Sequence, residues 1–336
     1  MNIAVIGCGA WGTVISQLLS KNSKDITVFC HRNDIVEEIN EQHTNALYLP
    51  KEPILNSCIQ AKLIPDFYEN ISEYDVIVIV VASPFYREVL EKIEPNLKAN
   101  QILLTATKGM EEKSLKSVYD ISVEVLSKEV CDTQFAVLSG PNLAKEIYLG
   151  KPAATVIASH NRKLAQGIQQ LISSETFRAY MSEDVLGVVY GGILKNIFAI
   201  AAGVLDALDF GANAKSALMV RSMSEIKRYA LHFGAKEESL MGLAGFGDLV
   251  TTCMSSDSRN YQTGFRLAKG ESLETITASM LAISEGVKTC RVIYKIAQNE
   301  KINMPITDAV YRLLYKKDSV QSIVRLLMTR KLKTED

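Results

Sequence analysis

The stretch that decides the fold is Asn2-Ile-Ala-Val-Ile6 followed directly by Gly7-Cys8-Gly9-Ala10-Trp11-Gly12. The apolar run predicts a buried strand, and the glycines that follow have the G-x-G-x-x-G spacing of a dinucleotide-binding turn. In such a turn Gly7 permits the tight bend, Gly9 lets the backbone approach a pyrophosphate, and Gly12 allows close contact between helix and strand. The first N–H groups of the next helix then face the anion. The alternative interpretation is a glycine-rich turn that binds nothing.

The segments on either side favour dinucleotide binding. Residues 13–19 are compatible with a helix, and Ile26–Cys30 predicts a second strand at the distance expected in a β-α-β unit. Further strands are expected at residues 75–81, 101–106, 135–138, 154–158 and 177–180, with helices at 32–42, 86–97 and 112–128. Continuous apolar strands suit a parallel sheet that is covered on both faces. The alternation therefore predicts an α/β fold with a doubly wound sheet of the Rossmann type.

The pattern changes to helical periodicity from Val188 onward. An apolar stripe runs through Ile193, Ile197, Ile200 and Val204, and long helical segments follow at residues 216–233 and 285–299. We therefore expect two domains, a dinucleotide-binding domain at residues 1–187 and an all-helical domain for substrate and catalysis at residues 188–336. The most apolar long stretch, residues 191–208, contains Lys195 and two other polar side chains, so we expect a core helix and no membrane span.

The totals exclude several classes of partner. The chain of 336 residues has room for about two domains, and its 37 Lys and Arg against 38 Asp and Glu leave no basic surplus for nucleic acid. The six cysteines show no C-x-x-C spacing and the four histidines are scattered, so no metal site is expected. The first strand begins at residue 2, leaving no room for a targeting segment ahead of it. We therefore expect reduced thiols and a cytoplasmic location.

In an open α/β sheet, ligands bind at the carboxyl ends of the strands, so the residues that follow each strand are candidates for chemistry. Lys108 follows the strand at 101–106 and lies beside Gly109. Gly140 and Asn142 follow the next strand, within Ser139-Gly-Pro-Asn142, and their polar groups are suited to a small ligand. The segment Ala82-Ser83-Pro84 follows the strand at 75–81, where a cofactor contact and a plain turn explain it equally well.

The helical half offers three further charged candidates. Lys195 interrupts an apolar stripe and is expensive to bury, so a functional role and a structural one are both open. Asp248 ends the glycine-hinged turn Gly245-Phe-Gly-Asp248, where an N-cap is the simpler explanation. Arg259 is flanked by Ser258 and Asn260; a guanidinium grips phosphate with two hydrogen bonds, although an exposed arginine is usually only solvated.

Taken together, the chain resembles the bacterial, soluble NAD(P)-dependent glycerol-3-phosphate dehydrogenases over nearly its whole length. The segments that carry the resemblance are Gly7-Cys-Gly-Ala-Trp-Gly12, Ala106-Thr-Lys-Gly109, Leu138-Ser-Gly-Pro-Asn142, Gly191-Gly-Ile-Leu-Lys-Asn196, Phe210-Gly-Ala-Asn-Ala-Lys215, Gly245-Phe-Gly-Asp-Leu249, Ser258-Arg-Asn260, Glu285-Gly286 and Met304-Pro-Ile-Thr307. The resemblance implies a Rossmann domain, a helical domain, and interconversion of dihydroxyacetone phosphate and sn-glycerol 3-phosphate at their junction. It also implies a supply of glycerol 3-phosphate for phospholipid synthesis, and a homodimer.

The resemblance also implies residue roles. Lys195 corresponds to the catalytic lysine, Lys108 to a second active-site lysine and Asp248 to their carboxylate partner. The implied substrate contacts are these three residues together with Gly140, Asn142, Ser258, Arg259 and Asn260. The implied cofactor contacts are Ala10, Trp11, Ala144, Ile283 and Glu285, to which we add Gly7, Gly9, Gly12, His31, Arg32, Lys108 and Arg259.

Two questions stay open from the sequence. The acidic residue that usually binds the ribose just beyond the second strand is absent, and His31 and Arg32 occupy its place. NADPH is therefore expected to be usable, and Asp34 nearby keeps NADH possible.

Two other functions compete with the implied one. A dehydrogenase of a 3-hydroxy acid would need a carboxylate clamp instead of the loop at 258–260, and a silent NADPH-sensing module would have no need of a proton donor.

Overall fold

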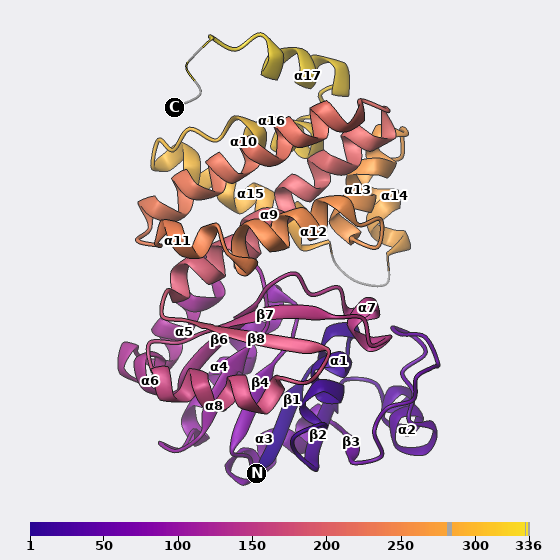
Figure 1. Cartoon of the computed structure of the whole chain (residues 1–336), viewed down its shortest axis with the longest axis vertical. Helices are drawn as coiled ribbons and strands as arrows, with labels where there is room; N and C mark the ends of the chain where they lie inside the picture. Colours follow the sequence, from indigo (N-terminus) through magenta and orange to yellow (C-terminus); the bar gives the residue numbers. More distant parts are fainter. Residues whose placement is uncertain (281–283, 333, 335–336) are drawn as a thin grey trace.

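The computed structural model describes residues 1–280, 284–332 and 334. Figure 1 shows a sheet with its flanking helices in the lower part of the molecule and a helical assembly above it. The N-terminus lies at the far end of the sheet part, and helix α17 lies at the opposite end of the molecule. The long helix α9 (Val185–Ala207) leads from the last strand into the helical part.

Eight strands form one sheet: β1 (Asn2–Ile6), β2 (Asp25–Cys30), β3 (Ile59–Leu63), β4 (Val76–Ile79), β5 (Ile102–Thr105), β6 (Phe135–Ser139), β7 (Ala153–Ala158) and β8 (Phe177–Ser182). Their order is β3-β2-β1-β4-β5-β6-β7-β8, and strands β1 to β6 are parallel. The order reverses direction between β1 and β4, which is where doubly wound sheets bind nucleotides. The glycine turn that follows β1 lies at this point.

Eight α-helices belong to the sheet part: α1 (Ala10–Leu19), α2 (Asn33–Gln42), α3 (Ile64–Glu69), α4 (Tyr86–Ile93), α5 (Val118–Leu126), α6 (Lys128–Gln134), α7 (Ala144–Tyr148) and α8 (Arg162–Ile172). Three single turns, η1 (Ile71–Glu73), η2 (Ser83–Phe85) and η3 (Glu94–Asn96), lie among them. Two apolar cores, one for each face of the sheet, hold the strands and helices together. The predicted doubly wound α/β architecture is therefore confirmed.

The helical part is built around α9. The other elements are α10 (Gly211–His232), α11 (Glu237–Leu240), η4 (Leu243–Gly247), α12 (Asp248–Met254), α13 (Arg259–Ala268), α14 (Leu273–Ser279), α15 (Glu285–Asn299), α16 (Pro305–Tyr311), η5 (Arg312–Lys316) and α17 (Val320–Met328). Helix α9 is surrounded by α10, α12, α13 and α15. Helices α9 and α13 touch closely, because a Cβ on Gly264 would lie 1.8 Å from the Ile200 carbonyl oxygen. Among the described residues no strand follows β8, as predicted.

Helix α9 is the described helix that is long and apolar enough to cross a membrane by length and composition, but 89% of its apolar window is buried inside the molecule. An apolar helix that is wrapped on its sides by other helices is a core helix. The core helix expected at residues 191–208 is therefore confirmed, and α9 carries Lys195 and Asn196 into the interior.

Three local expectations were wrong. Strand β7 pairs antiparallel with β6, because the chain between them forms only the five-residue helix α7 and does not cross the sheet. The edge strand β3 was missed, because only its alternate residues are buried. The helix predicted at 112–128 begins only at Val118, where Ser117 and Asp120 form a capping box, and ends at Leu126.

Candidate active site

Asp248 joins two lysines from different parts of the chain. Its Oδ1 accepts a hydrogen bond from Lys195 Nζ, and its Oδ2 accepts one from Lys108 Nζ at 2.7 Å. Lys195 also donates to Thr252 Oγ1 at 2.7 Å, and Lys108 donates to the Gly140 carbonyl at 3.2 Å. The three charged residues singled out from the sequence therefore meet at one point between the sheet and the helical part.

Each member of this cluster is fixed by its own element. Lys108 follows β5, Lys195 projects from the middle of α9, and Asp248 is the first residue of α12. Asp248 is 1% exposed and is not the N-cap of α12, since Gly247 occupies that position. Its carboxylate oxygens are bonded to the lysines, so the N-cap interpretation is wrong. Thr252 was missed, although it lies four residues after Asp248 and so shares its helix face.

The Lys195 ammonium has unusual surroundings. The residue is 8% exposed, and burial lowers the pKa of Lys195 to about 8, while the negative charge of Asp248 opposes this effect and the positive charge of Lys108 adds to it. An amine with a pKa near 8 can both donate and accept a proton close to neutral pH. The Lys195 site can therefore act as a general acid or base.

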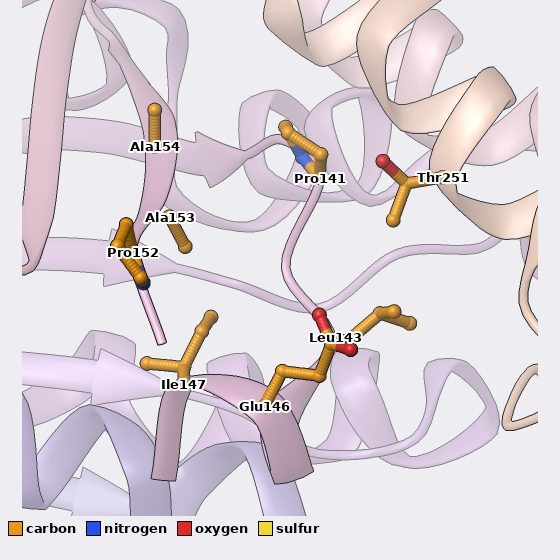
Figure 2. A pocket seen from close by; sticks show the side chains of 8 residues that line it. All are labelled: Pro141, Leu143, Glu146, Ile147, Pro152, Ala153, Ala154 and Thr251. Carbon is orange, nitrogen blue, oxygen red and sulfur yellow. The ribbon is translucent and has the colours of Figure 1, made fainter. Parts of the chain in front are cut away.

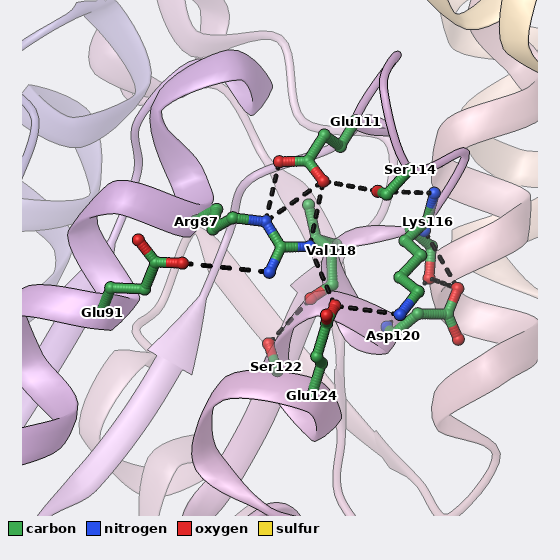
Figure 3. Close-up of polar contacts among 10 residues, drawn as sticks. Arg87, Glu91, Glu111, Ser114, Lys116, Val118, Asp120, Ser122 and Glu124 are labelled. Carbon is green, nitrogen blue, oxygen red and sulfur yellow. Dashed lines mark hydrogen bonds and ion pairs between the residues drawn. The ribbon is translucent and has the colours of Figure 1, made fainter.

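The loop that carries Lys108 is tied down by an ion-pair network around Arg87, which sequence reasoning missed (Figure 3). Arg87 on α4 donates from Nε to Glu111 at 2.9 Å and from a terminal nitrogen to Glu124 on α5 at 2.9 Å. Lys116 also pairs with Glu124 at 3.0 Å. A loop held from both sides positions Lys108 more firmly than a free loop would.

Asn260 ties three helices together next to Lys195. Its Nδ2 donates to Asn196 Oδ1 on α9 at 2.8 Å, and its Oδ1 accepts from the Gly286 N–H at 2.9 Å and from Ser284 Oγ at 2.7 Å. Ser258 caps α13 by accepting from the Tyr261 N–H at 3.3 Å. These two residues therefore already have structural bonds, and Asn196 and Ser284 are partners that the sequence did not reveal.

Arg259, which lies between Ser258 and Asn260 in the sequence, has different surroundings from these two residues. Its side chain reaches solvent, and among the described residues no hydrogen bond or ion pair engages its guanidinium. Its pKa is lowered because the surrounding protein displaces part of its hydration, an effect that the charge of Glu285 opposes. A guanidinium without a protein partner is available to an anionic ligand.

Glu285 begins α15 and bonds to the opposite half of the molecule. Its carboxylate accepts from Ser83 Oγ at 2.6 Å and from the Ser83 N–H at 3.2 Å. Burial raises the pKa of Glu285, and the hydrogen bonds from Ser83 and the charge of Arg259 oppose that rise. Ser83, at the start of η2, thus belongs to the site through Glu285.

The glycine turn has the geometry of an anion-binding loop. Gly7 has a φ of +113°, and a Cβ on Gly12 would lie 1.8 Å from the Gly7 carbonyl oxygen. A Cβ on Gly9 would meet nothing within 4 Å, so the space beside Gly9 is open. Helix α1, which begins with the partly exposed Ala10 and Trp11, has no side-chain cap. Its first N–H groups are therefore free to bind a phosphate.

The remaining predicted contacts differ in their surroundings. Arg32 and His31 are exposed after β2, and the Arg32 guanidinium binds Asp34, with Nε to Oδ1 at 2.9 Å. Ala144 is partly exposed at the start of α7. The Asn142 amide is bonded to β7, donating to the Ala154 carbonyl at 3.1 Å and accepting from Thr155 Oγ1 at 2.9 Å. Ile283 lies outside the described residues.

A pocket of about 280 Å³ lies among the loop after β6, helix α7, the start of β7 and helix α12 (Figure 2). It is lined by Pro141, Leu143, Glu146, Ile147, Pro152, Ala153, Ala154 and Thr251. Pro141 directly follows Gly140, which binds Lys108, and Thr251 precedes Thr252, which binds Lys195. Two residues of the pocket lining are thus sequence neighbours of residues that bind the lysines. Within the described part of the chain, no group of three or more His, Cys, Asp or Glu residues is arranged to hold a metal ion.

Comparison with protein families gives one consistent match. The model for the N-terminal part of NAD-dependent glycerol-3-phosphate dehydrogenase matches residues 2–165, and the model for its C-terminal part matches residues 184–325. The glycerol-3-phosphate dehydrogenase [NAD(P)+] of Nitratidesulfovibrio vulgaris is 38% identical over 335 residues, which is 100% of both chains. That of Oceanobacillus iheyensis is 38% identical over 98% of this chain and 94% of the relative.

Solved structures agree with these matches. The crystal structure of glycerol-3-phosphate dehydrogenase from Coxiella burnetii superimposes with a TM-score of 0.90 at 32% identity, covering 98% of this chain and 99% of that one. A PanE/ApbA family ketopantoate reductase from Ralstonia eutropha shares the fold, with a TM-score of 0.60 at 14% identity, 98% of this chain and 100% of that one being covered.

Proposed function

Because this chain belongs to the NAD-dependent glycerol-3-phosphate dehydrogenase family, which interconverts dihydroxyacetone phosphate and glycerol 3-phosphate with NAD(P)(H), we propose roles for its own residues in that reaction. The observation that carries the proposal is the single buried carboxylate, Asp248, that holds Lys195 and Lys108 together. Two cations held on one carboxylate form a pre-organised site for an oxygen that gains negative charge.

We assign the cofactor to the carboxyl ends of β1 and β4. The open space beside Gly9 and the uncapped start of α1 suit a pyrophosphate. Arg32, with His31, would hold the ribose end, while Ala10, Trp11, Ala144 and Glu285 would line the rest of the site. NADPH or NADH, when bound, supplies the hydride.

We assign the phosphate of the substrate to Arg259. A guanidinium without a protein partner can form two charge-assisted hydrogen bonds to a dianionic group. Ser258 and Asn260 flank it, and the bond between Asn260 and Asn196 ties this segment to α9, next to Lys195. The reacting end of the substrate would then lie toward Lys195, Lys108 and Gly140, with Asn142 shaping the wall behind them.

Lys195 is our choice of proton donor during reduction of the ketone. Its Nζ would give a proton to the substrate oxygen at C2, and the neutral amine would take that proton back in the reverse reaction. Asp248 orients the ammonium and favours its charged form, while Lys108 adds positive charge that stabilises the alkoxide. Thr252 fixes the direction of the Lys195 amine by accepting a second hydrogen bond.

A spectrophotometric assay tests the proposal. Purified protein is expected to oxidise NADPH and NADH with dihydroxyacetone phosphate, and to be far less active with unphosphorylated dihydroxyacetone. Equal activity with the two ketones would remove the phosphate-binding role of Arg259, and no activity with either would remove the whole assignment.

We further propose a domain boundary near residue 187, with residues 1–187 binding the dinucleotide and residues 188–336 supplying most substrate contacts.

We also propose that the protein is a cytoplasmic homodimer whose activity supplies glycerol 3-phosphate for phospholipid synthesis. Sedimentation of the purified protein would test the dimer.

A further inference from the structure

Two of the six cysteines, Cys8 and Cys30, belong to the same buried apolar core at the dinucleotide-binding turn. Cys8 is the middle residue of Gly7-Cys8-Gly9, and Cys30 is the last residue of β2. Strands β1 and β2 are in register up to the pair Ile6 and Phe29, and the Gly7 N–H donates to the Phe29 carbonyl at 3.0 Å. The register thus places Cys30 beside Gly7, so the two cysteines lie one residue apart in register at the ends of neighbouring strands.

Both side chains belong to the same buried apolar core. They are close enough for each thiol to shift the pKa of the other. The neighbouring Cys30 thiol, together with backbone N–H groups, lowers the pKa of Cys8, whereas Cys8 and burial raise the pKa of Cys30. Cys8 also precedes the start of α1, where the helix dipole favours a thiolate. Cys8 is thus suited to be the nucleophile that reacts first, and Cys30 to attack the oxidised Cys8 sulfur.

Exposure of the two residues fits the same order. Cys8 is 8% exposed and Cys30 is fully buried, so a small oxidant reaches Cys8 first. The other four cysteines are free as well, and Cys58 is the one with the greatest exposure, but none of them contacts a second thiol in the described contacts. Cys8 and Cys30 are accordingly the two thiols that a disulfide would join across adjacent strands.

We propose that Cys8 and Cys30 form a reversible redox pair, in which a peroxide converts the two thiols to a disulfide that weakens dinucleotide binding by the turn. The proposal rests on the cofactor site assigned above. It adds a modification site to that turn and makes its affinity depend on the thiol state.

The chemistry requires one equivalent of hydrogen peroxide. The Cys8 thiolate attacks one peroxide oxygen, the O–O bond breaks, and a sulfenic acid forms with release of hydroxide. The Cys30 sulfur then attacks the Cys8 sulfur, the S–S bond forms, and the S–O bond breaks. The protons of the two thiols end on the leaving oxygens. In total, two thiols are oxidised by two electrons and the peroxide is reduced to two water molecules.

The backbone of Cys8 explains why this bond would affect the cofactor. Asn45 Nδ2 holds the Cys8 carbonyl at 2.9 Å, and Thr13 Oγ1 is also bonded to Asn45 Nδ2 at 2.9 Å. The turn is thus fixed in the shape that leaves space beside Gly9. A covalent bond from Cys8 to Cys30 would pull on the residue between the two glycines, and a displaced turn would lose the close backbone approach that a pyrophosphate needs.

The test uses the whole protein, freed of reductant and treated with hydrogen peroxide in the presence and absence of NADPH. We expect intact mass spectrometry to show the loss of two hydrogen atoms, and a non-reducing peptide map to show one linked pair, Cys8 with Cys30. Dithiothreitol should reverse it, and bound NADPH should slow it. NADPH affinity, measured by fluorescence, should fall by about tenfold or more in the linked form.

Three variants sharpen the result. Cys8→Ser and Cys30→Ala should yield no linked peptide, while Cys58→Ser, which removes the most exposed thiol, should behave as the parent does. The wild-type peptide map decides the matter even if Cys30→Ala folds poorly. Absence of the linked peptide after peroxide treatment, or a linked protein with unchanged NADPH affinity, overturns the proposal. Failure of the untreated protein to bind NADPH would instead overturn the cofactor site, while the linked peptide would still report on the thiol pair.

Discussion

Ser83 Oγ, at the start of the turn η2 that follows β4, donates a 2.6 Å hydrogen bond to the carboxylate of Glu285, the first residue of α15. The bond joins the sheet to the helical part beside the proposed cofactor site. Replacing Glu285 by Ala would leave the Ser83 hydroxyl and N–H without their acceptor and Arg259 without its neighbouring negative charge. We expect the KM for NADPH to rise by about tenfold, with a smaller change in kcat.

Glu112→Ala is the matched control for Glu285→Ala. Glu112 also joins the sheet half to α15, through an ion pair with Arg291 at 2.6 Å. If the Glu285 variant acts only by loosening the contact between the halves, Glu112→Ala will raise the KM for NADPH equally. A rise confined to Glu285→Ala would support a direct role at the cofactor.

Lys195→Met tests the proton donor. Methionine fills the buried volume without a charge, and Asp248 keeps its bond to Lys108, so we expect a folded protein whose kcat is lower by roughly 10²–10⁴-fold. Because the pKa of Lys195 is lowered to about 8, reduction in the parent should slow as the pH rises through 8, while oxidation of glycerol 3-phosphate should speed up. Initial rates in both directions from pH 6 to 10 would check this.

Asp248→Asn supplies the companion measurement. Without the carboxylate, the ammonium of Lys195 loses its neighbouring negative charge while Lys108 still repels it. The midpoint of the pH–rate profile should therefore lie at a lower pH than in the parent. Near-normal turnover in Lys195→Met would make Lys195 structural and shift the donor role to Lys108.

Sequence reasoning singled out Lys108 because it follows a strand and Lys195 because it interrupts an apolar stripe, whereas the role of Asp248 came only from the resemblance. Glycine spacing likewise predicted the turn after β1, where Gly7 has the expected positive φ. A partner that acts by accepting a hydrogen bond, such as Thr252, carries no such signal. Its relevance depends on which atoms α9 and α12 bring together, and residue type does not reveal that.

The local errors have the same origin. The direction of β7 in the sheet depends on the path of the short connection between β6 and β7. The apolar sequence of β7 is equally compatible with a parallel and an antiparallel strand. The substrate contacts that the resemblance implies for Asn260 and Asn142 stay predictions; in the structure both amides are bonded to protein groups. Only the folded packing distinguishes an amide that faces a ligand from one that holds two helices or strands together.

Arg259→Ala tests the phosphate contact. The guanidinium would bind the phosphate in both the ground state and the transition state, so its loss should chiefly raise the KM for dihydroxyacetone phosphate, by about tenfold or more. Activity with dihydroxyacetone should change little. The preference for the phosphorylated ketone is thus the measured quantity. A variant that discriminates between the two ketones as well as the parent does would exclude Arg259 from this role.

Glu225→Gln tests a buried carboxylate in the helical part. Glu225 on α10 is 2% exposed, and it accepts hydrogen bonds from the N–H groups of Ile306 at 2.5 Å and Thr307 at 3.1 Å, and from Thr307 Oγ1 at 2.9 Å. Burial raises the pKa of Glu225 to about 7, although the three donors oppose the rise. The folded protein therefore holds this proton more tightly than the unfolded chain does.

The raised pKa of Glu225 makes the folded protein less stable at higher pH. The stability contributed by this group is fully present below its unfolded pKa near 4.5 and is lost as the pH rises through the folded pKa of about 7. We expect the free energy of unfolding to fall over this window by on the order of 3 kcal/mol from this group in the parent. In Glu225→Gln this part of the pH dependence should be absent, because glutamine stays neutral. The free energy of unfolding of both proteins can be measured by urea titration at pH 5, 6, 7 and 8. If the assignment is wrong, it will depend on pH equally in the parent and in Glu225→Gln.

Arg32→Ala tests cofactor preference. Arg32 is exposed just past β2, and its guanidinium binds only its neighbour Asp34 among the described contacts. A 2′-phosphate carries more charge than one carboxylate and would compete for that guanidinium with charge-assisted hydrogen bonds. We expect Arg32→Ala to weaken the use of NADPH by about tenfold, judged by kcat/KM, and to leave NADH nearly unchanged. Asp34→Asn should act in the opposite direction, because it frees the guanidinium and removes a negative charge next to the phosphate, so the ratio of NADPH to NADH use should rise. If Arg32 only solvates the start of α2, both variants will keep the ratio of the parent, and His31→Ala becomes the next variant to measure.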